Sequence, residues 1–292
     1  MNPSDYVSYI DTDSCYILVE DFILNNLKKK NKWLNMSEKK KLSYVKRIAD
    51  NIIVDINNRT FNEVQMKDYN SSVDDFKIEF GREIIAKTAL FVKKKKYACW
   101  VIDDDGSPVD KLKIMGLEVI RSDSSEAVRT RLRKVMEMIM KNFPDDEIRK
   151  TVTTYKNELK NVLPEEIAAN IGVNHIKKYI IDGKPKKGTP WHVKGVANYR
   201  MLLKTYKLEN AYEDISEGMK AKVIYVKKNK FGIESITFNR WVKEFNKDIQ
   251  IDYDLMIDKF FLKKIGFLLN PMNKMFILND NEKEEVLDAF FK

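Results

Sequence analysis

The sequence predicts an α+β fold, in which an antiparallel sheet backed by a long helix precedes a mainly helical part with a small β element. Two observations predict this order. Residues 5–20 alternate apolar and polar side chains, as half-buried strands do, and strand-like runs resume between residues 84 and 115. From residue 122 onward, apolar residues instead recur with the period of one helix face. We therefore expect domains at 1–120 and 121–280, with a short tail at 281–292.

The first predicted element is an antiparallel hairpin over residues 5–20. We expect its alternating apolar residues to be half-buried strand positions: Val7, Tyr9, Tyr16 and Leu18. The centre of the hairpin, Asp11-Thr-Asp-Ser14, is expected to form the turn and to hold two carboxylates at its tip. Asp and Ser are also common in turns without special function, so an ordinary polar turn is the alternative.

A basic turn, a long helix and further strands complete the predicted first domain. The turn is expected at residues 28–32, before Trp33, and the helix begins after Ser37, a suitable N-cap. The apolar residues of the helix share one face: Leu42, Val45, Ala49, Ile52 and Ile56. Strands are expected at 76–80, 84–92, 97–102 and 111–115, with a turn at 103–106.

Two successive helices open the predicted second domain. The first carries the stripe Val128, Leu132, Val135, Ile139 and Phe143 behind serine caps. The second follows Pro144 and carries the stripe Ile148, Val152, Tyr155 and Leu159. A loop at 183–190 then leads to a helix ending near residue 204. A strand is expected at 222–227, and helices at 252–262 and 279–292.

Composition limits the classes of function. The 292 residues carry a net charge of +9 with a pI near 9.1, so nucleic acid or an anionic membrane surface is the expected partner. No apolar run approaches the roughly 18 residues that span a bilayer, and the polar, acidic N-terminus is unlike a signal or transit peptide. Two isolated cysteines favour the reducing cytoplasm over a disulfide framework. Only two histidines are present, which argues against histidine-based catalysis.

Asp11 and Asp13 form the candidate catalytic and metal-binding site. Paired carboxylates suit Mg²⁺, which prefers oxygen ligands, and in two-metal phosphoryl transfer they hold cations roughly 3.5–4 Å apart. Such a site normally needs a further carboxylate. Glu83 is a possible neighbour from the same sheet, and a surface glutamate on a strand is the alternative.

Two lysine clusters are candidate DNA-binding sites. Lys94, Lys95 and Lys96 lead directly into Tyr97, so that lysines and tyrosine can project together toward a phosphate backbone. The second cluster lies in the Gly/Pro-containing loop and comprises Lys184, Lys186 and Lys187. A solvated lysine run and an ordinary basic loop are the respective alternatives.

The C-terminus carries a candidate protein-binding motif. Leu287, Phe290 and Phe291 fall on one side of a short helical turn. They can dock either in the groove of a partner or on the core of this chain.

Several of these segments, in this order, resemble family B DNA polymerases, and in particular the replicative polymerases of tailed bacteriophages. Tyr9-Ile-Asp-Thr-Asp-Ser14 is similar to the palm signature of tyrosine, glycine, then Asp-Thr-Asp-Ser. Lys94-Lys-Lys-Tyr97 is similar to the lysine-rich, tyrosine-ended motif that follows it in the palm. Lys111-Leu-Lys-Ile-Met-Gly-Leu-Glu118 resembles the stretch that leads from palm to thumb.

The later segments resemble the thumb and the tail of the same family. Thr189-Pro-Trp-His-Val-Lys-Gly195 and Phe260-Phe-Leu-Lys-Lys-Ile-Gly-Phe267 are similar to thumb segments. Residues 287–291 resemble a tail that binds a sliding clamp. The resemblance thus implies the second half of a palm at 1–120, a thumb at 121–280 and a clamp-binding tail at 281–292.

The resemblance also implies roles for the matching residues. Asp13 would be a principal metal-binding carboxylate with Asp11 beside it, together binding two Mg²⁺ ions. Tyr9, Thr12 and Ser14 would support the site, and the lysine-tyrosine motif would contact the primer strand. Ile10 departs from the family, which often has glycine there to let the backbone approach the primer end.

The resemblance further implies a partner chain. The family's other palm aspartate motif, its lysine-bearing fingers helix and its proofreading exonuclease precede this hairpin by a long stretch, yet ten residues precede Asp11. We therefore expect the C-terminal part of a split polymerase that acts on primer–template DNA and deoxynucleoside triphosphates with an N-terminal partner and a sliding clamp. A truncated gene is the other origin considered.

Two other functions are considered. The first is a non-catalytic, thumb-like module that binds duplex DNA and has a vestigial site. The second is a metal-dependent sugar transferase using Asp-x-Asp, which the absence of a preceding nucleotide-binding α/β pattern disfavours.

Overall fold

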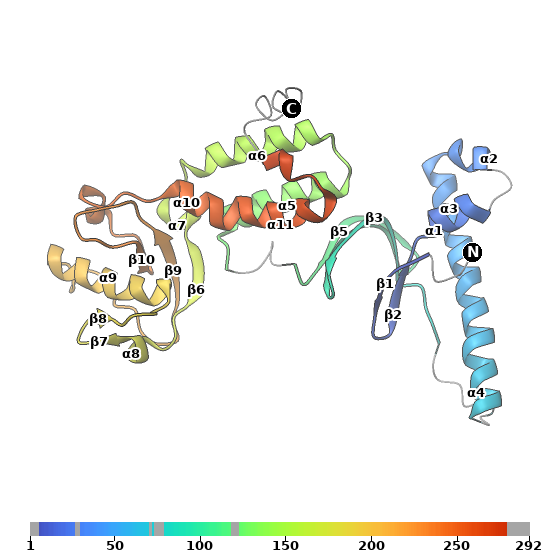
Figure 1. The fold of residues 1–292 in the computed structure, drawn as a ribbon, viewed down its shortest axis with the longest axis horizontal. Coiled ribbons are helices and arrows are strands. Elements are labelled where there is room, and N and C mark those ends of the chain that lie inside the picture. The colour runs from blue at the N-terminus through green and yellow to red at the C-terminus, as the bar shows by residue number, and fades with distance from the viewer. Residues whose placement is uncertain (1–5, 27–29, 70–71, 73–78, 118–122, 279–292) are drawn as a thin grey trace, which may run out of the picture. The chain divides into compact units, whose positions relative to one another are not determined.

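The structure is a computed structural model that describes residues 6–26, 30–69, 72, 79–117 and 123–278 (Figure 1). It confirms the predicted α+β fold. The chain divides into two compact units, Met1–Gly116 and Leu117–Lys292, which are described separately below. The predicted boundary at residue 120 and the predicted last helix at 279–292 lie outside the described residues.

The first unit contains a two-stranded hairpin and a three-stranded antiparallel sheet. In the hairpin, β1 (Val7–Asp11) pairs with β2 (Ser14–Ile17), as predicted. The sheet has the strand order β3-β4-β5, with β3 at Ile84–Lys93, β4 at Lys96–Asp104 and β5 at Ser107–Met115. The predicted strands at 84–92, 97–102 and 111–115 are thus confirmed, and each is longer than expected.

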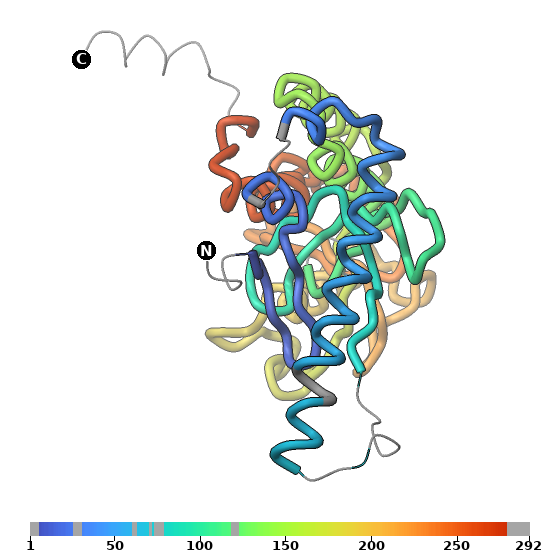
Figure 2. The backbone as a smooth tube through the Cα atoms, turned by 90° about the vertical axis from the view of Figure 1, so that its right-hand side faces the viewer, coloured from blue at the N-terminus to red at the C-terminus, as the bar shows by residue number. Residues whose placement is uncertain are grey.

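Helices form the rest of the first unit. α1 (Val19–Asn26) and α2 (Lys30–Leu34) are short. The predicted long helix is α3 (Glu38–Ile56), which continues through a π-helical segment, η2 (Asn57–Asn62), into α4 (Glu63–Asp68). These three segments form a continuous rod in both Figure 1 and Figure 2. α3 contains no fully buried residue, because its apolar stripe is only half-buried.

Three expectations about the first unit are wrong. Leu18 lies beyond β2 and is 43% exposed, since helix α1 begins one residue later. Trp33 is buried within α2 rather than following a basic turn, and its indole N–H donates to Glu20 at 3.0 Å. Phe80 is not in a strand, because its backbone N–H and C=O are both hydrogen-bonded by the side chain of Asn57. Residues 76–78 lie outside the described part.

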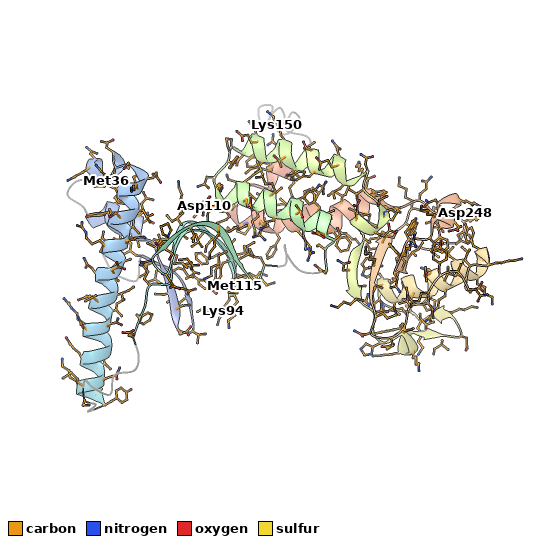
Figure 3. All side chains as sticks on the ribbon, turned by 180° about the vertical axis from the view of Figure 1, so that it is seen from behind. Met36, Lys94, Asp110, Met115, Lys150 and Asp248 are labelled. Carbon is orange, nitrogen blue, oxygen red and sulfur yellow. The ribbon has the colours of Figure 1, made fainter. Side chains whose placement is uncertain are left out.

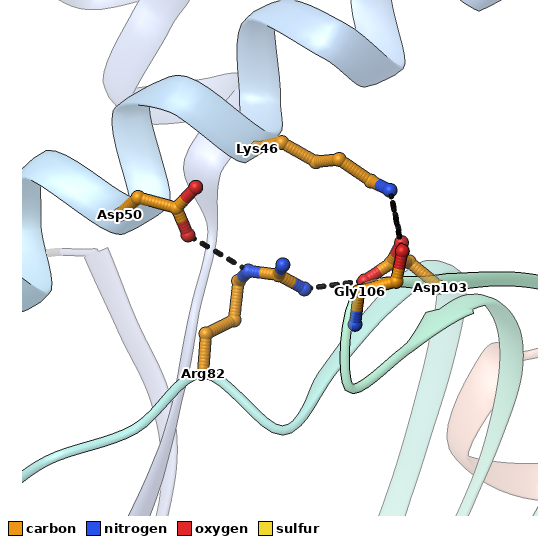
Figure 4. Close-up of polar contacts among 5 residues, drawn as sticks. All are labelled: Lys46, Asp50, Arg82, Asp103 and Gly106. Atoms are coloured by element: carbon orange, nitrogen blue, oxygen red, sulfur yellow. Dashed lines mark hydrogen bonds and ion pairs between the residues drawn. The ribbon is translucent and has the colours of Figure 1, made fainter.

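A buried ion-pair network joins α3 to the sheet (Figure 4). Asp103, on β4, has no solvent-exposed surface and is paired with both Lys46 of α3 and Arg82. It also accepts the backbone N–H of Gly106 at 3.1 Å, and Arg82 contacts Asp50 of α3 at 3.0 Å. Burial raises the pKa of Asp103, but the hydrogen bonds from Lys46 and Arg82 outweigh it, so the net shift is downward.

Replacement of Asp103 by Asn is therefore expected to destabilise the chain by about 3–5 kcal/mol, because two cations lose their buried counter-charge. The matched control is Asp104→Asn, which breaks an exposed pair with Lys111 and is expected to cost about 1 kcal/mol or less. Urea unfolding at neutral pH measures both.

The lowered pKa means that Asp103 stabilises the fold above its unfolded-state pKa and stops doing so as the pH falls through its folded pKa. The difference between wild type and Asp103→Asn should accordingly shrink in acid, and equal costs for the two variants would contradict the role of the network.

The second unit has a helical part with the predicted apolar stripes. α5 (Glu126–Met140) begins at Ser125, whose hydroxyl accepts the N–H of Val128 at 3.3 Å. α6 (Asp145–Leu159) follows Pro144. Most of the predicted stripe residues are fully buried: Val128, Leu132, Val135, Ile139, Ile148, Val152 and Leu159. Phe143 lies beyond α5 and is exposed, because Asn142 adopts a left-handed conformation that ends the helix.

The predicted helix at 252–262 is longer and is interrupted. α10 (Tyr253–Ile257) is capped by Asp252, whose carboxylate accepts the N–H of Leu255 at 3.0 Å. It continues through a π-helical segment, η6 (Asp258–Leu262), into α11 (Lys263–Leu269). Apart from α9, which is described below, the other helical segments described in this unit are short: α7 (Pro164–Ile167), α8 (Ile176–Tyr179), η5 (Lys243–Lys247), η7 (Asn270–Met272) and η8 (Met275–Leu278).

A small β element is also present, as predicted. Its three-stranded sheet has the order β10-β9-β6, with β6 at Ala169–Gly172, β9 at Lys220–Tyr225 and β10 at Ser235–Phe238. β6 and β10 were not predicted, because each has only four residues, too few to establish a period. Within the described residues, no helix is both long and apolar enough to cross a lipid bilayer.

Helix α9 (Trp191–Tyr206) packs closely on β10. A Cβ atom at Gly195 would lie 2.3 Å from the Thr237 hydroxyl, so only glycine permits this approach. The Thr237 hydroxyl donates to the His192 carbonyl at 2.6 Å, and the Ser235 hydroxyl donates to the Trp191 carbonyl at 2.8 Å. These contacts fix the start of α9 and hence the end of the basic loop that precedes it.

Candidate active site

The acidic turn of the first hairpin is tightly closed. Asp11 pairs with Ser14 across the hairpin, and the Asp13 N–H donates to the Asp11 carbonyl at 2.7 Å. The Thr12 hydroxyl donates to the Asp11 carboxylate at 3.2 Å, and the Ser14 hydroxyl donates to the Asp11 carbonyl at 3.2 Å. Asp13 is exposed at the tip, whereas the Asp11 side chain is only 21% exposed. The predicted residues of the turn are therefore brought together with both carboxylates at one tip.

Thr12 has an unusual backbone conformation. Its φ of 56° lies in the left-handed region, which is unfavourable for a β-branched residue. The Asp13-to-Asp11 hydrogen bond spans three residues around Thr12, which is the pattern of a γ-turn. Strain of this kind clusters at functional sites and is maintained only when surrounding contacts fix the backbone.

Those surrounding contacts are aromatic. Tyr9 and Tyr16 of the hairpin pack on Phe91 of β3 and Tyr97 of β4, and we call these four residues the aromatic cluster. Tyr9 stacks on Phe91 with ring centroids 4.9 Å apart and an interplanar angle of 9°. Tyr16 meets Phe91 and Tyr97 edge-on at 5.1 and 5.4 Å. Stacked and edge-to-face arrangements are the favoured geometries for such rings, so the aromatic cluster fixes the hairpin to the sheet.

The same contacts connect the acidic turn to the predicted lysine motif. Lys94 and Lys95 form the turn between β3 and β4, and Lys95 has a left-handed φ of 60°. The Lys95 backbone N–H donates to the Tyr9 hydroxyl at 2.7 Å, and its ammonium lies 3.9 Å from the Asp11 carboxylate. The structure thus brings together two motifs that are more than 80 residues apart in sequence.

The other residues of the lysine motif differ in exposure. Lys94 is exposed, the Lys95 side chain is 66% exposed, and Lys96 is half-buried. Tyr97 is only 9% exposed, since its ring lies within the aromatic cluster. The structure therefore gives Tyr97 a packing role, and its contact with DNA stays a prediction.

Two ionisable side chains lie in or next to the aromatic cluster, Tyr16 and Cys99. Burial and a hydrogen bond to Tyr97 raise the pKa of Tyr16, and burial raises the pKa of Cys99 to about 11. Both groups are therefore neutral at physiological pH. Cys99 is fully buried and Cys15 is exposed on β2, and neither forms a disulfide.

Glu83 lies apart from the aspartate pair. Its carboxylate contacts the Lys113 ammonium at 2.6 Å, on β5. In the part of the chain that the structure describes, no three His, Cys, Asp or Glu residues lie together in a group that could hold a metal ion. The Asp11–Asp13 pair is thus without a third carboxylate among those residues, and a metal role for Glu83 stays a prediction.

The second lysine cluster lies on a short hairpin in the second unit. β7 (Ile180–Ile181) pairs with β8 (Lys184–Pro185), and the Lys186 N–H donates to the Tyr179 carbonyl at 2.9 Å. Lys184, Lys186 and Lys187 are exposed. Among the described residues, none of the three forms an ion pair within 4 Å. Three cations of α5, by contrast, lie within 4 Å of the carboxylate of Glu158 or Glu137: Arg131, Arg133 and Lys134.

The residues predicted to bind a clamp, Leu287, Phe290 and Phe291, lie outside the described residues. Two features of the site escaped sequence analysis. The first is the backbone strain at Thr12, which has no sequence signal. The second is the close contact of Gly116 with the Lys95 turn. The presence of a glycine at the end of a predicted strand was a signal that could have suggested it.

Comparison with known proteins identifies the family. The sequence profile of DNA polymerase family B matches residues 40–272, which is most of the chain. The chain belongs to DNA polymerase family B. Two relatives are phage proteins described as DNA-directed DNA polymerases, which fits the resemblance found in the sequence.

The phage relatives are much longer than this chain. The polymerase of Enterobacteria phage T4 is 26% identical over 314 aligned positions, which cover 99% of this chain and 32% of the relative. That of Escherichia phage RB69 is 25% identical over 283 positions, covering 90% and 30%. A DNA polymerase of Thermococcus kodakarensis is 33% identical over 116 positions, covering 40% of this chain and 6% of the relative. The chain thus spans about a third of the length of its phage relatives.

The left-handed conformation of Lys95 generates a prediction. Gly adopts this conformation without the cost of roughly 1–2 kcal/mol that other residues pay. Lys95→Gly is therefore expected to be about 1–2 kcal/mol more stable than Lys94→Gly, since the two share the same gain in unfolded-chain entropy but only Lys95 has positive φ. Urea unfolding of both variants measures the difference, and equal stability would show that the turn is not strained at Lys95.

Proposed function

We propose that this family B chain acts as the C-terminal part of a template-directed DNA polymerase. In this function it supplies metal-binding aspartates and grips the primer–template duplex. The observation that carries the proposal is the placement of the Asp11–Asp13 turn beside Lys95, because carboxylates for metal ions and a cation for DNA phosphate then lie at one tip. In family terms, residues 1–120 would be the second half of the palm and 121–280 the thumb.

The donor set fits Mg²⁺. Both side chains are carboxylates, Asp13 is exposed, and residues 11–14 include no histidine or cysteine. A hard cation prefers such oxygen ligands. Asp11 and Asp13 would hold two Mg²⁺ ions, which when bound favour attack of the primer 3′-hydroxyl on the α-phosphate of a deoxynucleoside triphosphate. Thr12, Ser14 and Tyr9 would orient the aspartates through the hydrogen bonds and stacking described above.

The proposal includes a partner chain. Two-metal sites normally use a further carboxylate, and the described residues offer no third one beside Asp11 and Asp13. The phage relatives are about three times as long as this chain. We propose that an N-terminal polymerase fragment supplies the missing carboxylate and the residues that bind the triphosphate. A sliding clamp would bind residues 287–291.

A second candidate function is a non-catalytic module that grips duplex DNA. One observation favours it: the Lys95 ammonium lies beside Asp11, where it partly neutralises the carboxylate that a catalytic metal ion would need. The same lysines serve DNA binding in both functions, so duplex affinity alone does not distinguish them. Catalysis does.

Asp11→Asn and Asp13→Asn test catalysis in the pair reconstituted from this chain and its N-terminal partner. Each is expected to lower the rate of primer extension by on the order of 10³ or more, because loss of a metal ligand removes several kcal/mol of transition-state stabilisation. Duplex affinity should stay within about twofold. The matched control is Asp21→Asn, in α1.

The outcomes of this experiment separate the candidates. Full extension by both variants would contradict the catalytic role of the two aspartates and favour the non-catalytic function. Rapid extension by the wild-type chain without its partner would contradict the split arrangement.

The hairpin of β7 and β8, which carries the second lysine cluster, generates a separate prediction. Combined Lys186→Gln and Lys187→Gln should weaken duplex binding at all sequences, because phosphate contacts carry no sequence information. The slope of log Kd against log salt should fall by about 0.9 for each DNA phosphate that the variant no longer neutralises. The matched control is Lys39→Gln with Lys40→Gln on α3, which makes the same change in net charge. Equal reductions of the slope in the two double variants would show that Lys186 and Lys187 contribute only through the net charge of the chain.

A further inference from the structure

Gly116 lies at the end of β5 and makes an unusually close backbone contact. Its φ is +60°, and a Cβ atom placed on it would lie 1.9 Å from the carbonyl oxygen of Lys95. The carbonyl carbon of Lys95 would lie 3.1 Å away. Both neighbours are backbone atoms, which cannot rotate away as a flexible side chain can. Any other residue at position 116 must therefore displace the Lys95 turn or the end of β5.

The surrounding pairing leaves little freedom for such a displacement. Met115 pairs with Tyr97 across the β4–β5 ladder, while Lys93 pairs with Lys96 at the other side of the turn. In Figure 3, the labelled Lys94 and Met115 lie at the same end of the sheet. Tyr97 is itself held in the aromatic cluster. The Lys95 turn is therefore held from both sides, and Gly116 closes it from β5.

The consequence reaches the acidic turn through Lys95. The backbone carbonyl of Lys95 lies against Gly116, and the backbone N–H of Lys95 donates to the Tyr9 hydroxyl at 2.7 Å. Its side chain places an ammonium 3.9 Å from the Asp11 carboxylate. A shift of the turn at Gly116 would thus change a backbone hydrogen bond and a charge contact to the hairpin.

We propose that Gly116 is a positioning residue, which by having no side chain lets β5 hold the Lys95 turn against Tyr9 and beside Asp11. Gly116 has no polar side chain and acts only through Lys95. The part of this inference that concerns DNA rests on the function proposed above. The part that concerns the Lys95–Tyr9 contact is independent of it.

The test compares three variants of the full chain. Gly116→Ala adds both a Cβ and left-handed strain. Gly116→Asn adds the Cβ but tolerates the left-handed conformation better. Gly106→Ala is the matched control, because Gly106 has a φ of +85° in the turn between β4 and β5 but no atom within 4 Å of a Cβ placed on it. Gly106→Ala therefore adds the strain without the collision.

The first readout is hydrogen exchange of the Lys95 backbone amide, which needs no DNA. Both Gly116 variants are expected to accelerate it by about five- to tenfold, the factor for loss of one hydrogen bond, and to reproduce the rate seen in Tyr9→Phe. Tyr9→Phe combined with Gly116→Ala should exchange no faster than Gly116→Ala alone, since both act on one contact. Gly106→Ala should leave the rate unchanged. An unchanged rate in both Gly116 variants, or an equal rise in Gly106→Ala, would overturn the proposal.

The second readout is affinity for a primer–template duplex as a function of salt. If Lys95 no longer neutralises a DNA phosphate, the slope of log Kd against log salt should fall by about 0.9 in the Gly116 variants and not in the Gly106 variant. If the wild-type chain does not bind the duplex while the exchange rates change as expected, the proposed function fails and the positioning role of Gly116 stands. If the wild-type chain binds and the slopes are equal in all variants, Gly116 does not position Lys95 for DNA.

Discussion

The attachment of the first hairpin to the sheet is the interaction on which the candidate site depends. A two-stranded hairpin is marginally stable alone, because it buries little apolar surface. Here the four rings of the aromatic cluster supply that burial, and the Tyr9 hydroxyl adds a hydrogen bond to the Lys95 turn. The strained conformation of Thr12 is compatible with a fixed hairpin only because these contacts hold the residues on both sides of it.

The same unit is held together in a second way, by charge. Asp103 is buried between α3 and the sheet, where Lys46 and Arg82 satisfy its carboxylate. Because α3 has no fully buried residue, apolar packing contributes less to its attachment than is usual for a helix of 19 residues. The ion-pair network fixes the position of α3 along the sheet. The two residues that α3 contributes, Lys46 and Asp50, lie four residues apart and therefore on one face of the helix.

Local sequence signals predicted much of the fold and part of the site. The hairpin, the long helix, β3 to β5 and the stripes of α5 and α6 have clear periodicity, and the structure contains them. The exceptions arise from contacts that are distant in sequence. The side chain of Asn57 forms hydrogen bonds with the backbone N–H and C=O of Phe80, and the buried Trp33 donates to Glu20. Neither pairing leaves a local pattern in the sequence. The proximity of Lys95 to Asp11 and the collision at Gly116 are likewise products of three-dimensional packing.

The two cysteines differ in exposure, and the exposed one lies in the first hairpin. Cys99 is buried behind the aromatic cluster, and with a pKa near 11 its thiol stays protonated and unreactive. Cys15 is exposed on β2, next to Ser14 of the acidic turn. A thiol-directed fluorophore or spin label would therefore attach at one position of the unmodified chain. The protein thus carries an attachment point for a reporter within two residues of Asp13, where binding of the metal ions proposed for Asp11 and Asp13 would change the surroundings of the reporter.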